Sequence, residues 1–103
     1  MKKMFFSILM LLVMLITSGC FKKELRIAVD PTFPPMEYID DRGELKGFDI
    51  DFMSKVAESI NCELVYIQVP WKEIFYGLKY RKYDAVISAV TITEKRAMEW
   101  DFS

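Results

Sequence analysis

The residues best suited to bind a small anion lie between Ser88 and Arg96. Ser88, Thr91 and Thr93 carry hydroxyl groups, and Arg96 carries a guanidinium. The apolar run of residues 85–87 comes directly before them, which places the stretch where a buried strand gives way to a helical turn. Free backbone N–H groups at such a turn bind carboxylates, and a guanidinium does so through charge-assisted hydrogen bonds. The stretch therefore predicts a site for a small carboxylate.

Arg96 on its own has a second interpretation. A surface arginine commonly pairs with nearby carboxylates, here Glu94 or Glu99, and such pairs contribute little to stability. Because Arg96 follows Thr91 and a strand end, we favour the binding interpretation. A guanidinium matches a carboxylate with two parallel hydrogen bonds, and each charge-assisted bond contributes about 1.5–3 kcal/mol in a partly dry cleft.

Strand and helix patterns alternate along the chain in front of this stretch. Apolar and β-branched runs predict strands, and apolar residues at helical spacing predict helices between them. The expected strands cover residues 25–29, 63–69 and 85–89, and the expected helices cover residues 50–60 and 71–80. This order is typical of a parallel sheet with right-handed crossovers. The predicted fold class is therefore α/β, with a βαβαβ parallel sheet.

The carboxyl ends of these strands should lie together at one edge of the sheet, where ligands of such folds bind. Asp30 ends the first strand, Trp71 follows the second, and Ser88 and Ala89 close the third. A loop made rigid by prolines follows Asp30 and contains Phe33. Phe33 and Trp71 are candidates to contact a ligand, and packing in the core is a nearly equal interpretation for both.

Acidic residues mark the start of the helix expected over residues 50–60. Asp49 is placed to cap its first turn, and Asp51 favours the positive end of its dipole. A metal-binding or acid–base role for the two aspartates is the alternative, and capping is the preferred interpretation. Asn61 is expected to end the helix in the left-handed conformation. Before the helix, residues 36–46 predict a hairpin with Asp and Gly in its turn.

The composition excludes several classes of protein. The chain has 103 residues, enough for one small domain, and its 14 Lys and Arg nearly balance 15 Asp and Glu. No basic run suggests nucleic-acid binding. No His is present, which rules out His-based zinc sites and Ser-His-Asp catalysis. No cofactor or metal is predicted, and no carboxylate has an obvious apolar pocket that would raise its pKa, with Asp30 the one to watch.

Residues 1–20 have the pattern of a secretory signal. Lys2 and Lys3 precede an apolar stretch, residues 4–16, which is short for a membrane span. Small residues follow, and Cys20 closes the segment before a polar run. A plain cleaved signal and an uncleaved anchor helix are the alternatives to a signal that ends at a lipidated cysteine.

With these residues in place, residues 25–103 resemble the family 3 extracellular solute-binding proteins, the periplasmic or lipid-anchored receptors of polar amino acid ABC transporters. The motifs that carry the resemblance occur together in the family's order and spacing. They are Asp30-Pro31-Thr32-Phe33-Pro34-Pro35, Gly47-Phe48-Asp49-Ile50-Asp51, Tyr83-Asp84-Ala85, Thr91-Ile92-Thr93-Glu94-Lys95-Arg96 and Trp100-Asp101-Phe102-Ser103. The end of the signal likewise resembles a bacterial lipoprotein box, in which the cysteine, here Cys20, is lipidated.

The resemblance implies a fold of two α/β lobes that close on an amino acid. Phe33 and Trp71 would sandwich the ligand's side chain. Ser88 would offer its backbone carbonyl or its hydroxyl to the α-amino group. Asp30, at the end of the first strand, is also a predicted ligand-binding residue. Residues 1–20 would be the signal peptide, and residues 21–103 the first part of lobe 1.

At the carboxylate end, the resemblance implies contacts from the backbone N–H groups of Ala89 and Thr91 and from the Thr91 hydroxyl, with Arg96 as the clamp. It also implies a protein that catalyses no reaction and delivers its ligand to an ABC permease. Lipid on Cys20 would hold it at the outer face of the membrane.

The second lobe that the resemblance implies is not contained in this sequence. We therefore expect the 103-residue chain to bind amino acids weakly on its own and to fold poorly, because its site is half built and a strand edge is exposed. Two alternatives reuse the same fold. One is the sensory domain of a signalling receptor, and the other is an enzyme-associated domain, as in dehydratases and lytic transglycosylases.

Overall fold

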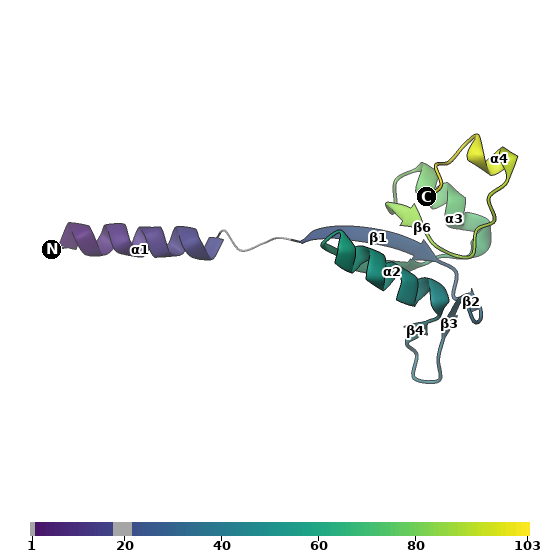
Figure 1. Cartoon of the computed structure of the whole chain (residues 1–103), viewed down its shortest axis with the longest axis horizontal. Helices are drawn as coiled ribbons and strands as arrows, with labels where there is room; N and C mark the ends of the chain where they lie inside the picture. The colour runs from purple at the N-terminus through teal and green to yellow at the C-terminus, as the bar shows by residue number, and fades with distance from the viewer. Residues whose placement is uncertain (1, 18–21) are drawn as a thin grey trace.

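The structure is a computed structural model that describes residues 2–17 and 22–103. Its first element is helix α1, Lys2–Thr17, which lies apart from the sheet (Figure 1). In the described ranges, no helix has both the length and the apolar content needed to cross a membrane. The predicted lipidation site, Cys20, lies outside the described residues.

A three-stranded parallel sheet forms the centre of the molecule. Its strands are β1, Lys23–Val29, β5, Cys62–Gln68, and β6, Ala85–Val86, in the order β5-β1-β6. The predicted α/β class and the parallel βαβαβ order are confirmed. The last strand is shorter than predicted and ends at Val86. Ala89 could not have belonged to it, because its φ of +48° is not that of extended backbone.

Helices cover both faces of this sheet (Figure 1). They are α2, Phe48–Ser59, and α3, Trp71–Lys79. Successive side chains of a strand point to opposite faces, so Ile27 and Val29 pack with Ile50 of α2, whereas Ala28 packs with Ile74 of α3. Each fully buried aliphatic side chain contributes about 1.5–3 kcal/mol, and these two small clusters hold the helices on β1.

A second, antiparallel sheet follows β1. Its strands are β2, Thr32–Phe33, β3, Glu37–Ile39, and β4, Leu45–Lys46. The β3–β4 pair confirms the predicted hairpin. The loop expected around Phe33 is in part a strand, because Thr32 and Phe33 pair with Tyr38 and Glu37. This pairing holds Glu37 beside the carboxyl end of β1.

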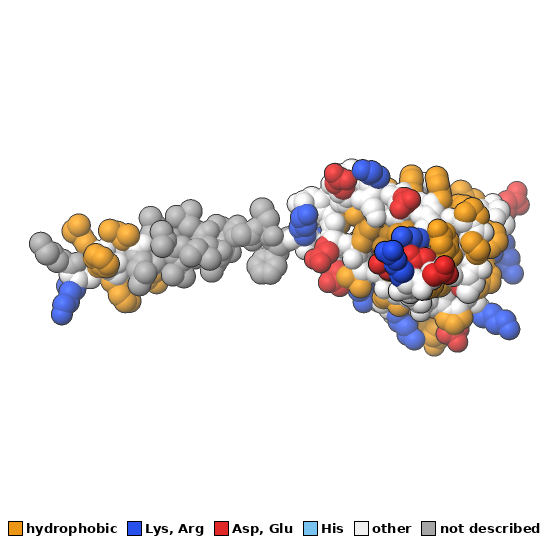
Figure 2. All heavy atoms as spheres, turned by 90° about the horizontal axis from the view of Figure 1, so that it is seen from below, with side chains coloured by type: hydrophobic (Ala, Val, Ile, Leu, Met, Phe, Trp, Pro, Cys, Tyr) orange, Lys and Arg blue, Asp and Glu red, His pale blue; other side chains and the backbone are white. Residues whose placement is uncertain are grey.

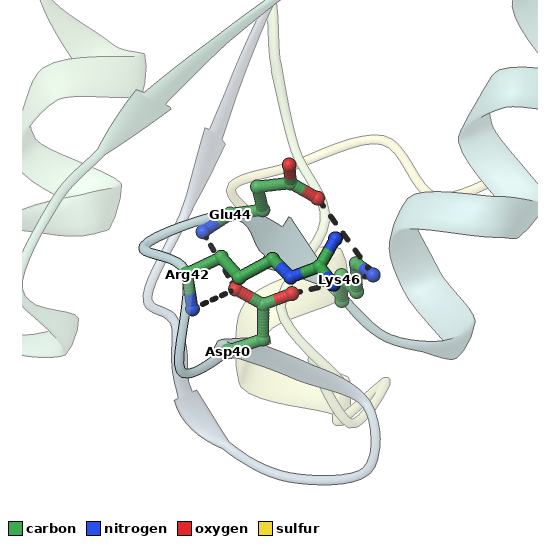
Figure 3. Close-up of polar contacts among 4 residues, drawn as sticks. All are labelled: Asp40, Arg42, Glu44 and Lys46. Carbon is green, nitrogen blue, oxygen red and sulfur yellow. Dashed lines mark hydrogen bonds and ion pairs between the residues drawn. The ribbon is translucent and has the colours of Figure 1, made fainter.

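The turn of the hairpin is organised by one carboxylate (Figure 3). Asp40 Oδ1 accepts hydrogen bonds from the backbone N–H groups of Arg42 and Glu44, both at 2.9 Å, and Oδ2 lies 3.2 Å from Lys46 Nζ. The bond from Glu44 is the main reason that the pKa of Asp40 lies below its ordinary value. Figure 2 looks from the hairpin side, where acidic and basic side chains lie next to one another.

The connection from β4 to α2 differs from the prediction. Helix α2 begins at Phe48, and Gly47, with a φ of +132°, is its N-cap residue. Asp49 therefore sits inside the first turn and does not cap the helix as predicted. Its side chain is buried, 5% exposed, and turns toward the segment after β6. At the other end of the helix, Asn61 has a φ of +53°, which confirms the predicted left-handed residue.

Candidate functional site

A cavity of about 260 Å³ lies at the carboxyl ends of β1 and β6. It is lined by Asp30, Thr32, Phe33, Glu37, Trp71, Ser88 and Ala89. The structure thus brings together the segments after three different strands, as the parallel topology predicted. Of the predicted ligand-binding residues, Thr91 and Arg96 do not line this cavity, and Glu37 lines it without having been predicted.

Asp30 ties the loop after β1 to the start of α3. Its Oδ1 accepts a hydrogen bond from Thr32 Oγ1 at 2.7 Å, and its Oδ2 accepts one from the backbone N–H of Trp71 at 2.9 Å. Trp71 is the first residue of α3, whose initial N–H groups have no partner within the helix. Asp30 therefore fixes the position of Trp71 relative to Phe33 across the cavity.

The hydroxyl of Ser88 makes two hydrogen bonds inside the protein. Its Oγ accepts a hydrogen bond from the backbone N–H of Asp30 at 3.1 Å and donates one to Glu37 Oε1 at 2.6 Å. Ser88 is buried, at 6% exposed. The hydroxyl therefore has no proton left to donate to a ligand, whereas its oxygen retains a second acceptor site, so the contact of Ser88 with an α-amino group stays a prediction.

The backbone N–H of Ala89 also has a partner. It donates to Asp49 Oδ2 at 3.0 Å, across from the start of α2. Ala89 itself has a left-handed φ of +48°. The expected contact between this N–H and a ligand carboxylate is therefore absent from this conformation, although Ala89 still lines the cavity.

Glu37 and Asp49 form a pair of buried carboxyl groups beneath the cavity. Glu37 is 1% exposed, and its Oε2 has no hydrogen-bond donor among the described residues. Burial, followed by the contact with Asp49, raises the pKa of Glu37 to about 7. We expected from the sequence that no carboxylate would have a pocket that raises its pKa, and for Glu37 this expectation was wrong. The sequence around Glu37 does not indicate this environment, because its hydrogen-bond partner, Ser88, lies 51 residues later.

Arg96 lies in a neighbouring cavity of about 530 Å³, between α3 and the short helix α4, Glu94–Ala97. Its guanidinium carbon lies 5.5 Å from the ring centre of Trp71 and 5.4 Å from that of Phe75. Its Nη1 donates to the backbone carbonyl of Thr91 at 2.8 Å. Trp71 lines both cavities, whereas Phe33 lines the first and Arg96 the second.

The structure also shows whether Arg96 forms ion pairs, how helix α4 begins and whether acidic residues cluster. Within the described residues, no ion pair involves Arg96, so the surface pairing with Glu94 or Glu99 is not observed. Thr93 caps α4, its hydroxyl accepting the N–H of Arg96 at 3.1 Å. No cluster of acidic or cysteine side chains that could hold a metal occurs in residues 2–17 and 22–103.

Residues 25–103 match the model of the bacterial extracellular solute-binding proteins, family 3. The chain belongs to this family. The match confirms the family that the sequence motifs predicted. The histidine-binding periplasmic protein of Escherichia coli (strain K12) is 35% identical over 106 residues, an alignment that covers 100% of this chain and 41% of that protein. The chain thus spans about two fifths of the length of the curated family 3 relatives that match it over its whole length.

Solved structures of family 3 relatives have the same fold. An ancestral arginine-binding protein bound to arginine superimposes with a TM-score of 0.77 at 34% identity, covering 82% of this chain and 37% of that one. The arginine-bound form of domain 1 from TmArgBP of T. maritima has a TM-score of 0.70 at 32% identity, covering 73% and 60%. The predicted assignment to part of one lobe of a periplasmic-binding-protein fold is therefore confirmed.

Proposed function

We propose that this protein binds an amino acid in the 260 Å³ cavity and presents it to an ABC permease as the solute-binding component of an uptake system. The observation that carries the proposal is the convergence of Asp30, Phe33, Trp71 and Ser88 on one cavity from separate segments. Membership of the solute-binding family and the binding proteins among the relatives support it. The relatives are not enzymes, and no observed geometry favours a reaction.

Phe33 and Trp71 form the two walls against which the ligand's side chain packs. They are 59% and 40% exposed, so they are not packed in the core, which was the competing interpretation. Both line the cavity, and the Asp30–Trp71 bond holds one wall in place. Aromatic rings of this kind contribute a large apolar contact when a ligand covers them.

We propose that Arg96, which lies outside the cavity in the ligand-free protein, moves to bind the α-carboxylate at the Trp71 end of the cavity. In the ligand-free protein the guanidinium is held over the ring of Trp71 and by the Thr91 carbonyl. Its remaining N–H groups are free to form two charge-assisted hydrogen bonds with a carboxylate. Ser88 is the acceptor for the α-amino group, through its backbone carbonyl or through the remaining acceptor site of its hydroxyl.

The ligand that we propose has a cationic side chain. Relatives named for histidine and arginine binding support this class, and so does the acidic cavity, which Asp30 and Glu37 line without a Lys or Arg. Domain 1 of the T. maritima relative is known in an arginine-bound form. This chain covers 60% of that domain. We propose that it too binds arginine, in place of the weak or absent binding that its sequence led us to expect.

Titration calorimetry with a panel of amino acids tests this function. Arginine is expected to bind the purified protein with a Kd of roughly micromolar magnitude, and at least about tenfold more tightly than glutamine or leucine, because a carboxylate–cation contact contributes about 1.4 kcal/mol or more. Lysine serves as the second cation. Tighter binding of glutamate than of arginine, or no heat with any amino acid, would refute the proposal.

We further propose that Cys20 carries the lipid that anchors the protein at the outer face of the membrane. The support is the sequence pattern of residues 1–20, in which small residues and Cys20 follow an apolar stretch. Two acyl chains bury many methylenes, each worth about 0.8 kcal/mol. Mass spectrometry of the mature N-terminus is expected to show a diacylglyceryl-modified Cys20, and an unmodified residue there would contradict the anchor.

A further inference from the structure

We propose that Glu37 and Asp49 hold one proton between them in the ligand-free protein, and that a cationic amino acid bound in the adjoining cavity displaces this proton into solvent. The inference rests on the proposed function and adds that binding is linked to pH. Glu37 and Asp49 would thus couple ligand binding to proton release, although neither residue contacts the ligand's α-carboxylate.

The geometry of the pair requires a proton. Glu37 and Asp49 are 1% and 5% exposed, so two ionised carboxylates in contact here would lack water to separate their charges. Glu37 Oε1 already accepts the Ser88 hydroxyl, and Asp49 Oδ2 already accepts the N–H of Ala89. Glu37 Oε2 is buried without a donor among the described residues. A proton on Oε2 that is shared with Asp49 satisfies both groups.

The charged groups that face Glu37 all raise its pKa. Asp49 approaches from α2 and Asp30 from the segment after β1, and both are acidic. Ser88 contributes a neutral hydroxyl from the segment after β6. No Lys or Arg of the described chain is among the groups that shift the pKa of Glu37, which lies at about 7. A cationic ligand would therefore bring to this carboxyl a positive charge that, among the described residues, no ion pair supplies.

The sign of the linkage follows from these charges. Glu37 lines the cavity, so a cationic side chain beside Asp30 lies close to it and favours its ionised form. Binding then releases a proton, and acid opposes binding by the same amount. The pKa of Glu37 in the ligand-free protein is about 7. The affinity for a cation should therefore be close to its maximum at pH 8 and about tenfold lower at pH 6. A neutral amino acid should show little change.

Calorimetry with arginine at pH 6 and pH 8 tests the linkage. Arginine is the appropriate probe because its guanidinium stays charged over this range, whereas histidine would itself titrate. The Kd at pH 6 is expected to be about tenfold higher than at pH 8. Parallel titrations at pH 6 in buffers of different ionisation enthalpy should show about one proton released for each arginine bound.

The variant that isolates Glu37 is Glu37→Gln. Its amide keeps the contacts to Ser88 and Asp49 but cannot ionise, so the Kd for arginine should be equal at pH 6 and pH 8 within about twofold. Glu44→Gln is the matched control, because this carboxylate lies in the same hairpin but is 61% exposed, and it should keep the tenfold difference. If Glu37→Gln does not fold, the buffer dependence of the unmodified protein decides the question.

The outcomes separate this inference from the proposed function. Arginine binding with the same Kd at both pH values and no proton release would overturn the inference and leave the function standing. A tenfold pH effect that persists in a folded Glu37→Gln protein would also overturn it. Failure of every amino acid to bind at either pH would overturn the proposed function, and the linkage with it.

Discussion

Replacement of Arg96 by alanine is expected to weaken arginine binding by about a hundredfold or more. Two charge-assisted hydrogen bonds to the α-carboxylate are lost, and each contributes about 1.5–3 kcal/mol, so their combined loss exceeds the 2.7 kcal/mol or so that corresponds to a hundredfold change. Titration calorimetry of the variant against arginine measures the change. Because every amino acid carries the same carboxylate, the loss should extend to every ligand that binds.

The structure indicates that this loss would not arise from unfolding. Arg96 lies on the short helix α4, which Thr93 caps through a backbone bond that alanine preserves. Its guanidinium contacts the faces of Trp71 and Phe75 and is not part of either core cluster. The variant should therefore keep the melting temperature within a few degrees of the original value.

Arg42→Ala is the matched control for the loss of an arginine. Arg42 is exposed at the tip of the β3–β4 hairpin, where its backbone N–H, which alanine retains, makes the bond to Asp40 (Figure 3). Arginine affinity should be unchanged in this variant. Arg96→Lys should bind weakly, since an ammonium cannot form the paired bonds of a guanidinium. Unimpaired binding by a folded Arg96→Ala protein would remove Arg96 from the site.

Replacement of Gly47 by alanine is expected to lower the free energy of unfolding by about 3–5 kcal/mol. A Cβ at this position would lie 2.9 Å from the Cα of Glu37 and still closer to the carbonyl group of Met36. Both contacts are with backbone, which cannot turn aside as a side chain could. The φ of +132° at Gly47 adds strain for any residue other than glycine. Urea denaturation followed by circular dichroism measures the change.

Gly43→Ala separates crowding from backbone strain. Gly43 also has a positive φ, +78°, but nothing lies within 4 Å of a Cβ built there. Its replacement should cost only the conformational term, about 1–2 kcal/mol. If both variants lose the same free energy of unfolding, the close approach of β3 to α2 at Gly47 does not contribute to the cost of the substitution. Because Glu37 and Asp49 flank this approach, the Gly47 variant should also lose the pH dependence of binding.

The sequence predicted the parts of the fold that local patterns control. Apolar runs and helical spacing identified β1, β5, α2 and α3, and their alternation was enough to predict the parallel sheet and the edge where Asp30, Trp71 and Ser88 meet. Asn61 was placed correctly because left-handed helix ends have a local preference for asparagine. The motifs then identified the family.

What the sequence did not predict depends on contacts between distant segments. Asp49 resembled a helix cap, but Gly47 takes that position and releases the Asp49 carboxylate to bond Ala89, 40 residues away. The buried contact of Glu37 with Ser88 likewise joins residues that are 51 positions apart in the sequence. The stacking of Arg96 on Trp71 is a tertiary contact that separates the predicted carboxylate clamp from the cavity in the free protein.

An amide NMR titration of the protein with arginine would show whether the cavity between Phe33 and Trp71 is the amino acid site. Saturable shifts are expected for the N–H groups of Asp30, Phe33 and Trp71, with a smaller response from the exposed hairpin turn at Arg42. Shifts confined to the hairpin turn, or shifts that do not saturate, would contradict the assignment of this cavity as the binding site.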